Sequence, residues 1–141
     1  MRIMIINGPN LNMLGIREPE IYGRRTYEDL VDFIENARGQ DNELCFVQSN
    51  HEGDIVDAIQ DAFFDGYEGI VLNPAGYTHT SIAILDAIKA VPIPCVEVHI
   101  SAIEERESYR QHSYISEGAI KTIAGKGFDG YIEAIDTLIN A

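Results

Sequence analysis

Short apolar runs alternate with longer amphipathic segments along most of the chain. Runs of four to six largely apolar residues predict five strands, at 2–6, 44–47, 69–72, 95–98 and 119–124. Four intervening segments carry apolar residues at helical spacing, and they predict helices at 26–38, 51–65, 78–90 and 128–139. The run at 69–72 is continuous rather than alternating, which is typical of a strand buried on both faces of a parallel sheet.

Local signals agree with the predicted helix ends. Thr26 followed by Asp29 resembles an N-cap with an acid at the third helical position, and Gly39 is expected to end that helix. Two long segments remain. Residues 7–25 read as a loop long enough to be functional, and the polar segment 101–117 is expected to form short helical turns.

Regular alternation of strands and helices predicts one α/β domain with helices on both faces of a parallel sheet. We expect a flavodoxin-like three-layer sandwich with five strands in the order 2-1-3-4-5. The chain has 141 residues, a length that suits a single catalytic domain over 1–141.

Composition narrows the possible partners. The formal net charge is −13, which argues against a surface for nucleic acid or for an anionic membrane. No apolar run approaches the length of a membrane span, and no signal peptide is recognisable, so we expect a cytoplasmic protein. Cys45 and Cys95 lie in predicted strands and are interpreted as core thiols. An anionic small substrate stays possible because a pocket can be locally positive.

Polar residues gather just after the predicted strands, where ligands bind in open parallel sheets. Three of the four histidines lie at such positions: His51, His79 and His99. Alone, each would be read as a cap or surface residue, but together, with polar neighbours, they favour a site. The arginines are also clustered, which invites explanation in an acidic protein, although Arg24 and Arg25 are interpreted as solvated charges rather than ligands. Five of the seven arginines are Arg17, Arg24, Arg25, Arg106 and Arg110.

Metal and phosphate sites fit this sequence poorly. No two histidines are spaced as ligands on one helix, and there is no Cys-x-x-Cys. Asn7-Gly-Pro-Asn10 after the first strand is not a phosphate-cradling motif, and Pro9 lacks the N–H that such a loop would use. We therefore expect no metal and no cofactor.

Four blocks carry a resemblance to a known family. They are Asn7-Gly-Pro-Asn-Leu-Asn-Met-Leu-Gly15 with Arg17-Glu-Pro19 and Tyr22-Gly23, Gln48-Ser-Asn-His-Glu-Gly53, Asn73-Pro-Ala-Gly-Tyr-Thr-His-Thr-Ser81, and Glu97-Val-His-Ile-Ser101 with Arg106-Glu107, Tyr109-Arg110 and Ser113. In this order, nearly end to end, the chain resembles the type II 3-dehydroquinate dehydratases. The resemblance implies anti elimination of water from 3-dehydroquinate through an enolate, in the shikimate pathway.

The resemblance also implies roles for individual residues. Tyr22 matches the general base, and Arg17 its activator on the same loop. Asn10 matches the residue that holds a water against the enolate oxygen. His99 matches the general acid, and Glu97 the partner that orients it. The remaining matches are substrate-binding positions: Asn73, His79, Asp86, Ile100, Ser101 and Arg110. Of these, Asp86 would be lent by a neighbouring subunit, and Ile100 would bind through its N–H. Arg106 matches a residue that helps to set the charge of the tyrosine.

The implied chemistry is physically reasonable for these residues. A free tyrosine titrates near ~10, and lowering its pKa by about 2–3 units needs roughly 3–4 kcal/mol. One guanidinium at about 4 Å supplies on the order of 4 kcal/mol at an effective dielectric of about 20. The alternative dehydratase strategy, a lysine Schiff base, is disfavoured because Lys89, Lys121 and Lys126 do not follow strands in the candidate site.

Other interpretations remain at this point. A flavodoxin-like binding or signalling module would need a Ser/Thr-rich phosphate loop or an acidic pair after the first strand, and the chain has neither. A catalytically dead scaffold is disfavoured because every matched catalytic position is filled. Ala102, Glu104, Glu105 and Tyr109 depart from the usual family pattern and bear on loop packing and affinity. The family further implies a homododecamer, a tetramer of trimers.

Overall fold

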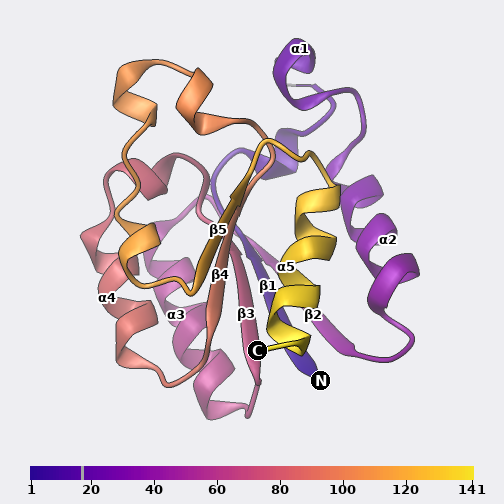
Figure 1. Ribbon diagram of the computed structural model, residues 1–141, viewed down its shortest axis with the longest axis vertical. Coiled ribbons are helices and arrows are strands. Elements are labelled where there is room, and N and C mark those ends of the chain that lie inside the picture. The colour runs from indigo at the N-terminus through magenta and orange to yellow at the C-terminus, as the bar shows by residue number, and fades with distance from the viewer. Residues whose placement is uncertain (17) are drawn as a thin grey trace.

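The computed structural model describes residues 1–16 and 18–141, and for Tyr22 the backbone alone. Its centre is a sheet of five parallel strands in the order β2-β1-β3-β4-β5 (Figure 1). The strands are β1 (Arg2–Asn7), β2 (Glu43–Gln48), β3 (Gly69–Asn73), β4 (Cys95–His99) and β5 (Lys121–Ala124). The predicted topology and strand order are confirmed.

Helices cover both faces of this sheet and complete the three layers. Figure 1 shows α3 (Glu52–Phe64) and α4 (Ile82–Ala90) on one side, with α2 (Tyr27–Arg38) and α5 (Asp129–Ile139) on the other. Within the described residues, no helix is long and apolar enough to cross a membrane.

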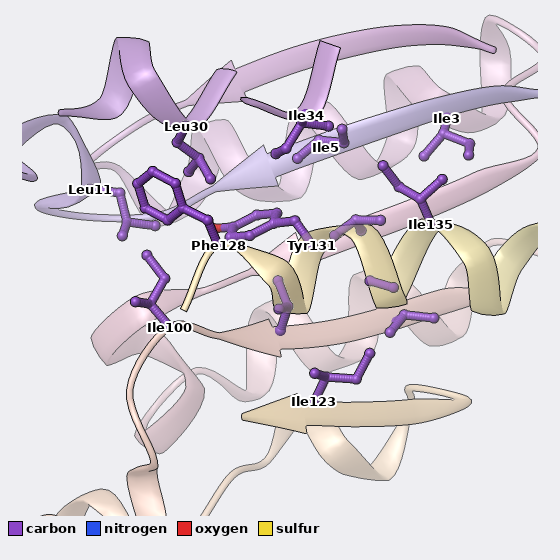
Figure 2. Close-up of a cluster of buried hydrophobic side chains, with 14 of the residues drawn as sticks. Ile3, Ile5, Leu11, Leu30, Ile34, Ile100, Ile123, Phe128, Tyr131 and Ile135 are labelled. Carbon is purple, nitrogen blue, oxygen red and sulfur yellow. The ribbon is translucent and has the colours of Figure 1, made fainter. Parts of the chain in front are cut away.

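The core follows from the two-residue period of the strands. Along β1, Ile3 and Ile5 pack toward α2 and α5, whereas Met4 and Ile6 pack toward α3 and α4. Two buried apolar clusters result, one on each face of the sheet. Figure 2 shows part of the cluster under α2 and α5, with Tyr131 of α5 lying in its middle.

Helix α2 begins as its sequence predicts. Thr26 Oγ1 accepts a hydrogen bond from the Asp29 amide at 3.1 Å, and the Asp29 carboxylate accepts one from the Thr26 amide at 2.9 Å. This reciprocal capping satisfies two amide groups that a helix start otherwise leaves unpaired. The expected end is also confirmed, because the helix stops at Arg38 and Gly39 is its C-cap.

Most predicted boundaries lie within one residue of the observed ones, and three larger differences remain. Helix α4 starts at Ile82 rather than Thr78, because Ser81 caps it and residues Ala75–His79 form a separate 3-10 turn. Strand β5 is shorter than expected and starts at Lys121. The loop 7–25 contains a one-turn helix, α1 (Pro19–Tyr22), that apolar periodicity did not predict. The expectation of short helical turns in 101–117 is confirmed by three 3-10 turns.

The loops after β1 and β3 touch through their backbones. The Gly8 amide donates to the Asn73 carbonyl at 2.8 Å, so the first residue beyond β1 continues the pairing with β3. A β-carbon built at Gly8 would lie 2.6 Å from the Pro74 carbonyl oxygen. Only glycine allows this approach, which sets the relative position of the two loops.

Replacing Gly8 with alanine should therefore push these loops apart. We expect Gly8→Ala to lower the free energy of unfolding by about 1–3 kcal/mol, the usual cost of overpacking. Gly53→Ala is the matched control, because a β-carbon there meets nothing within 4 Å. Urea unfolding followed by circular dichroism would measure both, and equal stabilities of the two variants would contradict the steric argument.

Candidate active site

A cavity of about 180 Å³ opens at the carboxyl ends of the central strands. In Figure 1, α1 and the 3-10 turns at Ile103–Glu105 and Ser108–Arg110 stand at this end of the molecule, opposite the two termini. The cavity is lined by residues that follow β1, β3 and β4: Pro9, Asn10, Leu11, Asn73, Ala75, Gly76, His79, His99, Ile100, Ser101, Ile103, Arg106 and Arg110. Eight of the predicted site residues therefore come together here.

A second cavity, of about 520 Å³, adjoins the first and shares Ile100, Ser101 and Arg106 with it. Its wall also includes Ile21 and Gly23, the neighbours of Tyr22 on α1. The backbone that carries Tyr22 therefore borders the same space as the strand ends.

A larger cavity of about 940 Å³ lies elsewhere, between α2 and α5. Three of the charged side chains on its wall are paired: Lys126 Nζ lies 2.6 Å from Glu133, and Asp136 lies 2.7 Å from Arg38 Nε outside the lining. None of the predicted site residues whose side chains the structure describes lines it. Size alone does not identify the site, and the smaller polar cavity is the better candidate.

Glu97 and His99 form a buried pair, of which His99 lines the small cavity. They lie two residues apart on β4 and so share one face of the sheet. Glu97 is fully buried and His99 is 4% exposed. His99 Nε2 is hydrogen-bonded to Glu97 Oε2. The predicted orienting contact between the two residues is present.

Hydroxyl groups fill the remaining acceptor positions of the Glu97 carboxylate. Oε2 accepts from Thr78 at 2.9 Å and from Ser113 at 2.7 Å. Oε1 accepts from Ser116 at 2.7 Å and from Thr122 at 3.1 Å. These donors come from four separate positions in the chain, and sequence reasoning missed them as site residues.

This environment keeps the carboxylate charged. Burial raises the pKa of Glu97, but hydrogen bonds from His99, Ser116 and Ser113, together with the His99 charge, outweigh burial and hold the pKa at about 2. An ionised carboxylate only accepts, so His99 Nε2 must carry a hydrogen. The other ring nitrogen, Nδ1, is then left to exchange a proton with a ligand.

His79 contributes a second, neutral imidazole. Its Nδ1 lies 2.7 Å from the backbone carbonyl oxygen of His112, which can only accept, so Nδ1 carries the hydrogen. Burial lowers the pKa of His79, and the charges of His99 and Arg110 lower it further, against the opposing hydrogen bond to His112. A neutral ring with hydrogen on Nδ1 presents Nε2 as an acceptor, which suits a hydroxyl group of a ligand.

The asparagines at the cavity are held by backbone and side-chain contacts. Asn10 has a left-handed backbone with φ of 68°, a conformation that asparagine tolerates better than most residues. Its amide donates to Asn50 Oδ1 at 3.0 Å. Asn73 is anchored at both ends of its side-chain amide: Oδ1 accepts from the Ala75 amide at 3.1 Å, and Nδ2 donates to the Tyr131 hydroxyl at 2.8 Å.

Two arginines give this acidic protein a locally positive wall. Arg110 Nε lies 2.9 Å from Glu107, and Arg106 Nε lies 3.8 Å from the same carboxylate. Arg106 Nη1 also donates to Ser101 Oγ at 3.5 Å. Both guanidinium groups line the cavity, where they could meet an anionic ligand. Among the residues that the structure describes, no group of three His, Cys, Asp or Glu side chains is placed to hold a metal ion.

Two candidate residues, Asp86 and His51, are not at the cavity of this single chain. Asp86 is exposed on α4 and His51 is exposed before α3, and neither lines the cavity. Arg17 lies outside the described residues, and Tyr22 is described only by its backbone. The predicted roles of Arg17 and Tyr22 thus rest on the motif and on the position of α1.

Comparison with known proteins decides the family. The model of the family described as dehydroquinase class II matches residues 1–139. The chain belongs to the class II dehydroquinase family. The resemblance drawn from the four sequence blocks is thereby confirmed, and the flavodoxin-like binding module is set aside.

Individual relatives are similar over their full length. The chain is 55% identical to 3-dehydroquinate dehydratase 1 of Corynebacterium efficiens over 141 residues, which covers 99% of this chain and 92% of that protein. It is 54% identical to 3-dehydroquinate dehydratase of Fusobacterium nucleatum over 142 aligned residues, covering 99% and 97%.

Solved structures agree with the sequence relatives. The crystal structure of type II dehydroquinase from Butyrivibrio crossotus superposes with a TM-score of 0.96 at 51% identity, covering all of this chain and 98% of that one. The type II dehydroquinase from Propionibacterium acnes gives 0.92 at 41% identity, with coverage of 99% and 97%. The α/β fold predicted for this dehydroquinase is confirmed.

The hydroxyl-lined carboxylate generates a prediction about acid stability. Because the pKa of Glu97 falls from an ordinary 4.5 to about 2 on folding, its charge stabilises the native state above pH about 4.5. This contribution is lost as pH falls through about 2. The free energy of unfolding of the wild type should therefore fall between pH 5 and 2. In Glu97→Gln this fall should be smaller, by on the order of 3 kcal/mol.

Urea unfolding at a series of pH values would measure this difference. Glu104→Gln is a suitable control, since it removes an exposed acid in the same region of the chain. Parallel pH profiles for wild type and Glu97→Gln would contradict a carboxylate held ionised by its neighbours.

Proposed function

We propose that this chain converts 3-dehydroquinate to 3-dehydroshikimate, a hydro-lyase reaction of the shikimate route to aromatic amino acids, with residues 1–141 acting as a single catalytic domain. Membership in the dehydroquinase class II family carries the reaction class. The observation that carries the mechanism is the buried Glu97–His99 pair, which opens onto a polar cavity beside α1.

The first step requires a base beside the substrate ketone. We assign it to Tyr22, whose oxygen takes the proton from the carbon next to the carbonyl and leaves an enolate. Asn10 lines the cavity and is placed to hold a water whose hydrogen bond stabilises the enolate oxygen. No lysine lines the cavity, which supports an enolate rather than a Schiff base.

The second step requires an acid, because hydroxide is a poor leaving group. Protonated His99 donates the Nδ1 hydrogen to the departing hydroxyl, the carbon–oxygen bond breaks, and the enolate collapses to the conjugated enone with release of water. Glu97 stabilises the imidazolium through Nε2, as the buried contact permits. The assigned base and acid come from two separate elements, α1 and β4.

Tyr22 must be ionised to act as a base at neutral pH, and nearby arginine side chains would favour the ionised form. Arg17 shares its loop, and Arg106 lines both the cavity at the strand ends and the one beside α1. The same positive wall suits the substrate carboxylate. We assign Asn73, Ser101 and the Ile100 amide to the substrate carboxylate and leaving hydroxyl, and His79 and Arg110 to the ring hydroxyls.

Removing the phenol oxygen should abolish the chemistry and spare binding. We expect Tyr22→Phe to lower kcat by on the order of 10²–10⁴-fold, the usual contribution of a positioned base, with KM changed less than about threefold. The rise in enone absorbance on adding 3-dehydroquinate measures turnover. Tyr67→Phe is the matched control, because Tyr67 contacts Arg2 just before β3, at the other end of the strands, and is outside both cavity linings.

Failure of the wild-type chain to turn over 3-dehydroquinate would overturn the proposed function. That result would favour the alternative in which the protein is a catalytically dead scaffold. An active wild type with a nearly unaffected Tyr22→Phe variant would overturn only the assignment of Tyr22.

We further assign Asp86 to the active site of a neighbouring copy, in a trimer that assembles into a dodecamer in the cytoplasm. Asp86 is exposed on α4 and does not reach its own cavity. Ile82 lies one helical turn earlier on the same face and is 55% exposed, which suits a face covered by another subunit.

Mixed assemblies test this assignment. Random assembly of co-expressed Tyr22→Phe and Asp86→Ala chains places an intact tyrosine beside an intact neighbouring aspartate in about a quarter of the sites. The mixture should therefore recover about one quarter of wild-type activity. Each variant expressed alone is the control. Mixtures no more active than the single variants would show that Asp86 does not act across subunits.

A further inference from the structure

Two buried asparagines lie side by side where β1 and β3 end. Asn7 and Asn73 are partners in the parallel register of these strands, and both are almost completely buried. Both follow the alternation that sends Ile5 and Val71 toward α5, so they share that face of the sheet. Asn73 lines the active-site cavity, whereas Asn7 does not.

Tyr131 of α5 joins the two amides. Its hydroxyl donates to Asn7 Oδ1 at 2.6 Å and accepts from Asn73 Nδ2 at 2.8 Å. The side chain is fully buried and does not line the cavity. Figure 2 shows its ring running toward Leu11 and Ile100, which do line the cavity. The mechanism assigns Tyr131 no role.

The direction of these hydrogen bonds decides what Asn73 offers to a ligand. A phenol has a single hydrogen, and the Tyr131 hydrogen is committed to Asn7 Oδ1. The phenol oxygen can therefore only accept a hydrogen bond from Asn73, so the NH₂ group of the Asn73 amide must face Tyr131. Because Nδ2 carries two hydrogens and Tyr131 takes one, the other remains for a ligand in the cavity.

The carbonyl oxygen of the Asn73 side chain favours the same orientation. Oδ1 accepts from the Ala75 amide at 3.1 Å, a contact that a flipped amide would replace with two facing donors. Asn7 Nδ2 in turn donates to the Tyr27 hydroxyl at 3.4 Å, a distance longer than usual for such a bond, so Tyr27 adds little to the orientation of Asn7. The whole chain of bonds runs in one direction, from Asn73 through Tyr131 to Asn7, and then from Asn7 to Tyr27.

We propose that Tyr131 is a positioning residue for substrate binding: by accepting from Asn73 and donating to Asn7, it locks the Asn73 amide with an N–H toward the anionic substrate. The inference rests on the proposed function, in which Asn73 binds the substrate carboxylate region. Tyr131 acts through Asn73 and stays out of contact with the reacting atoms.

A positioning role and a purely structural role predict different kinetics. If Tyr131 orients a binding group, its loss weakens ground state and transition state alike and raises KM with kcat nearly unchanged. If Tyr131 only stabilises the fold, its loss lowers the fraction of active enzyme, which reduces the apparent kcat and leaves KM unchanged.

Tyr131→Phe is the decisive variant because it removes one oxygen and keeps the ring in the core. We expect KM for 3-dehydroquinate to rise by about tenfold, the effect of one hydrogen bond to a charged group, with kcat changed less than about twofold. Tyr27→Phe is the matched control. It removes the same atom from the far end of the same chain of bonds, has no contact with Asn73, and should leave KM unchanged.

A second variant covers the case in which Tyr131→Phe does not fold. Asn7→Ala removes the acceptor that commits the phenol hydrogen, so Tyr131 becomes free to donate to Asn73, and KM should rise in the same direction. Melting temperatures of all three variants separate loss of stability from loss of binding.

The outcomes are distinct. An active wild type with raised KM in Tyr131→Phe or Asn7→Ala, and unchanged KM in Tyr27→Phe, supports the inference. Unchanged KM in both former variants, or an equal rise in all three, overturns it and leaves the enzyme's function intact. A wild-type chain without 3-dehydroquinate turnover overturns the proposed function and this inference together.

Discussion

The buried carboxylate of Glu97 is the constraint around which the active-site end is arranged. A charge with no exposure is tolerated only when its oxygens are fully hydrogen-bonded. Its donors come from the turn after β3, from β4, from the segment 101–117 and from β5. Satisfying one carboxylate therefore fixes the relative positions of four parts of the chain, and among them it fixes the ring of His99.

The two faces of the sheet supply different parts of the site. On the face covered by α4, Glu97 holds a titratable imidazole in a defined tautomer. On the face covered by α5, the neutral bonds among Asn7, Tyr131 and Asn73 hold an amide in a defined orientation. The charged Glu97–His99 network suits proton transfer. The neutral network suits orientation, because the single phenol hydrogen of Tyr131 sets the direction of both of its hydrogen bonds.

Local charge at the cavity opposes the charge of the whole molecule. The chain carries a net charge of −13, yet Arg106 and Arg110 both line the cavity. Interactions among exposed charges fade beyond about 10 Å at moderate salt, so nearby guanidinium groups dominate the potential that a bound anion meets. An anionic substrate and an ionised tyrosine both benefit from this arrangement.

The sequence by itself determined the layers, the strand order and the family, because alternating apolar periods and short contiguous motifs are local properties of the chain. It also brought Glu97 and His99 together, since residues two apart on a strand share a face. Boundaries were less predictable: α4 starts at Ile82 because Ser81 caps it, a choice that Thr78 could equally have made on local grounds.

Only the tertiary structure decided which polar residues cooperate across the fold. Thr122 and Ser116 look like ordinary strand and loop residues until parallel pairing of β4 with β5 sets them against Glu97. Tyr131 reads as one more apolar position of α5, and its link to Asn7 spans 124 residues. Such partners carry no local signal, because hydrogen bonds between distant segments depend on register and packing that no short stretch of sequence contains.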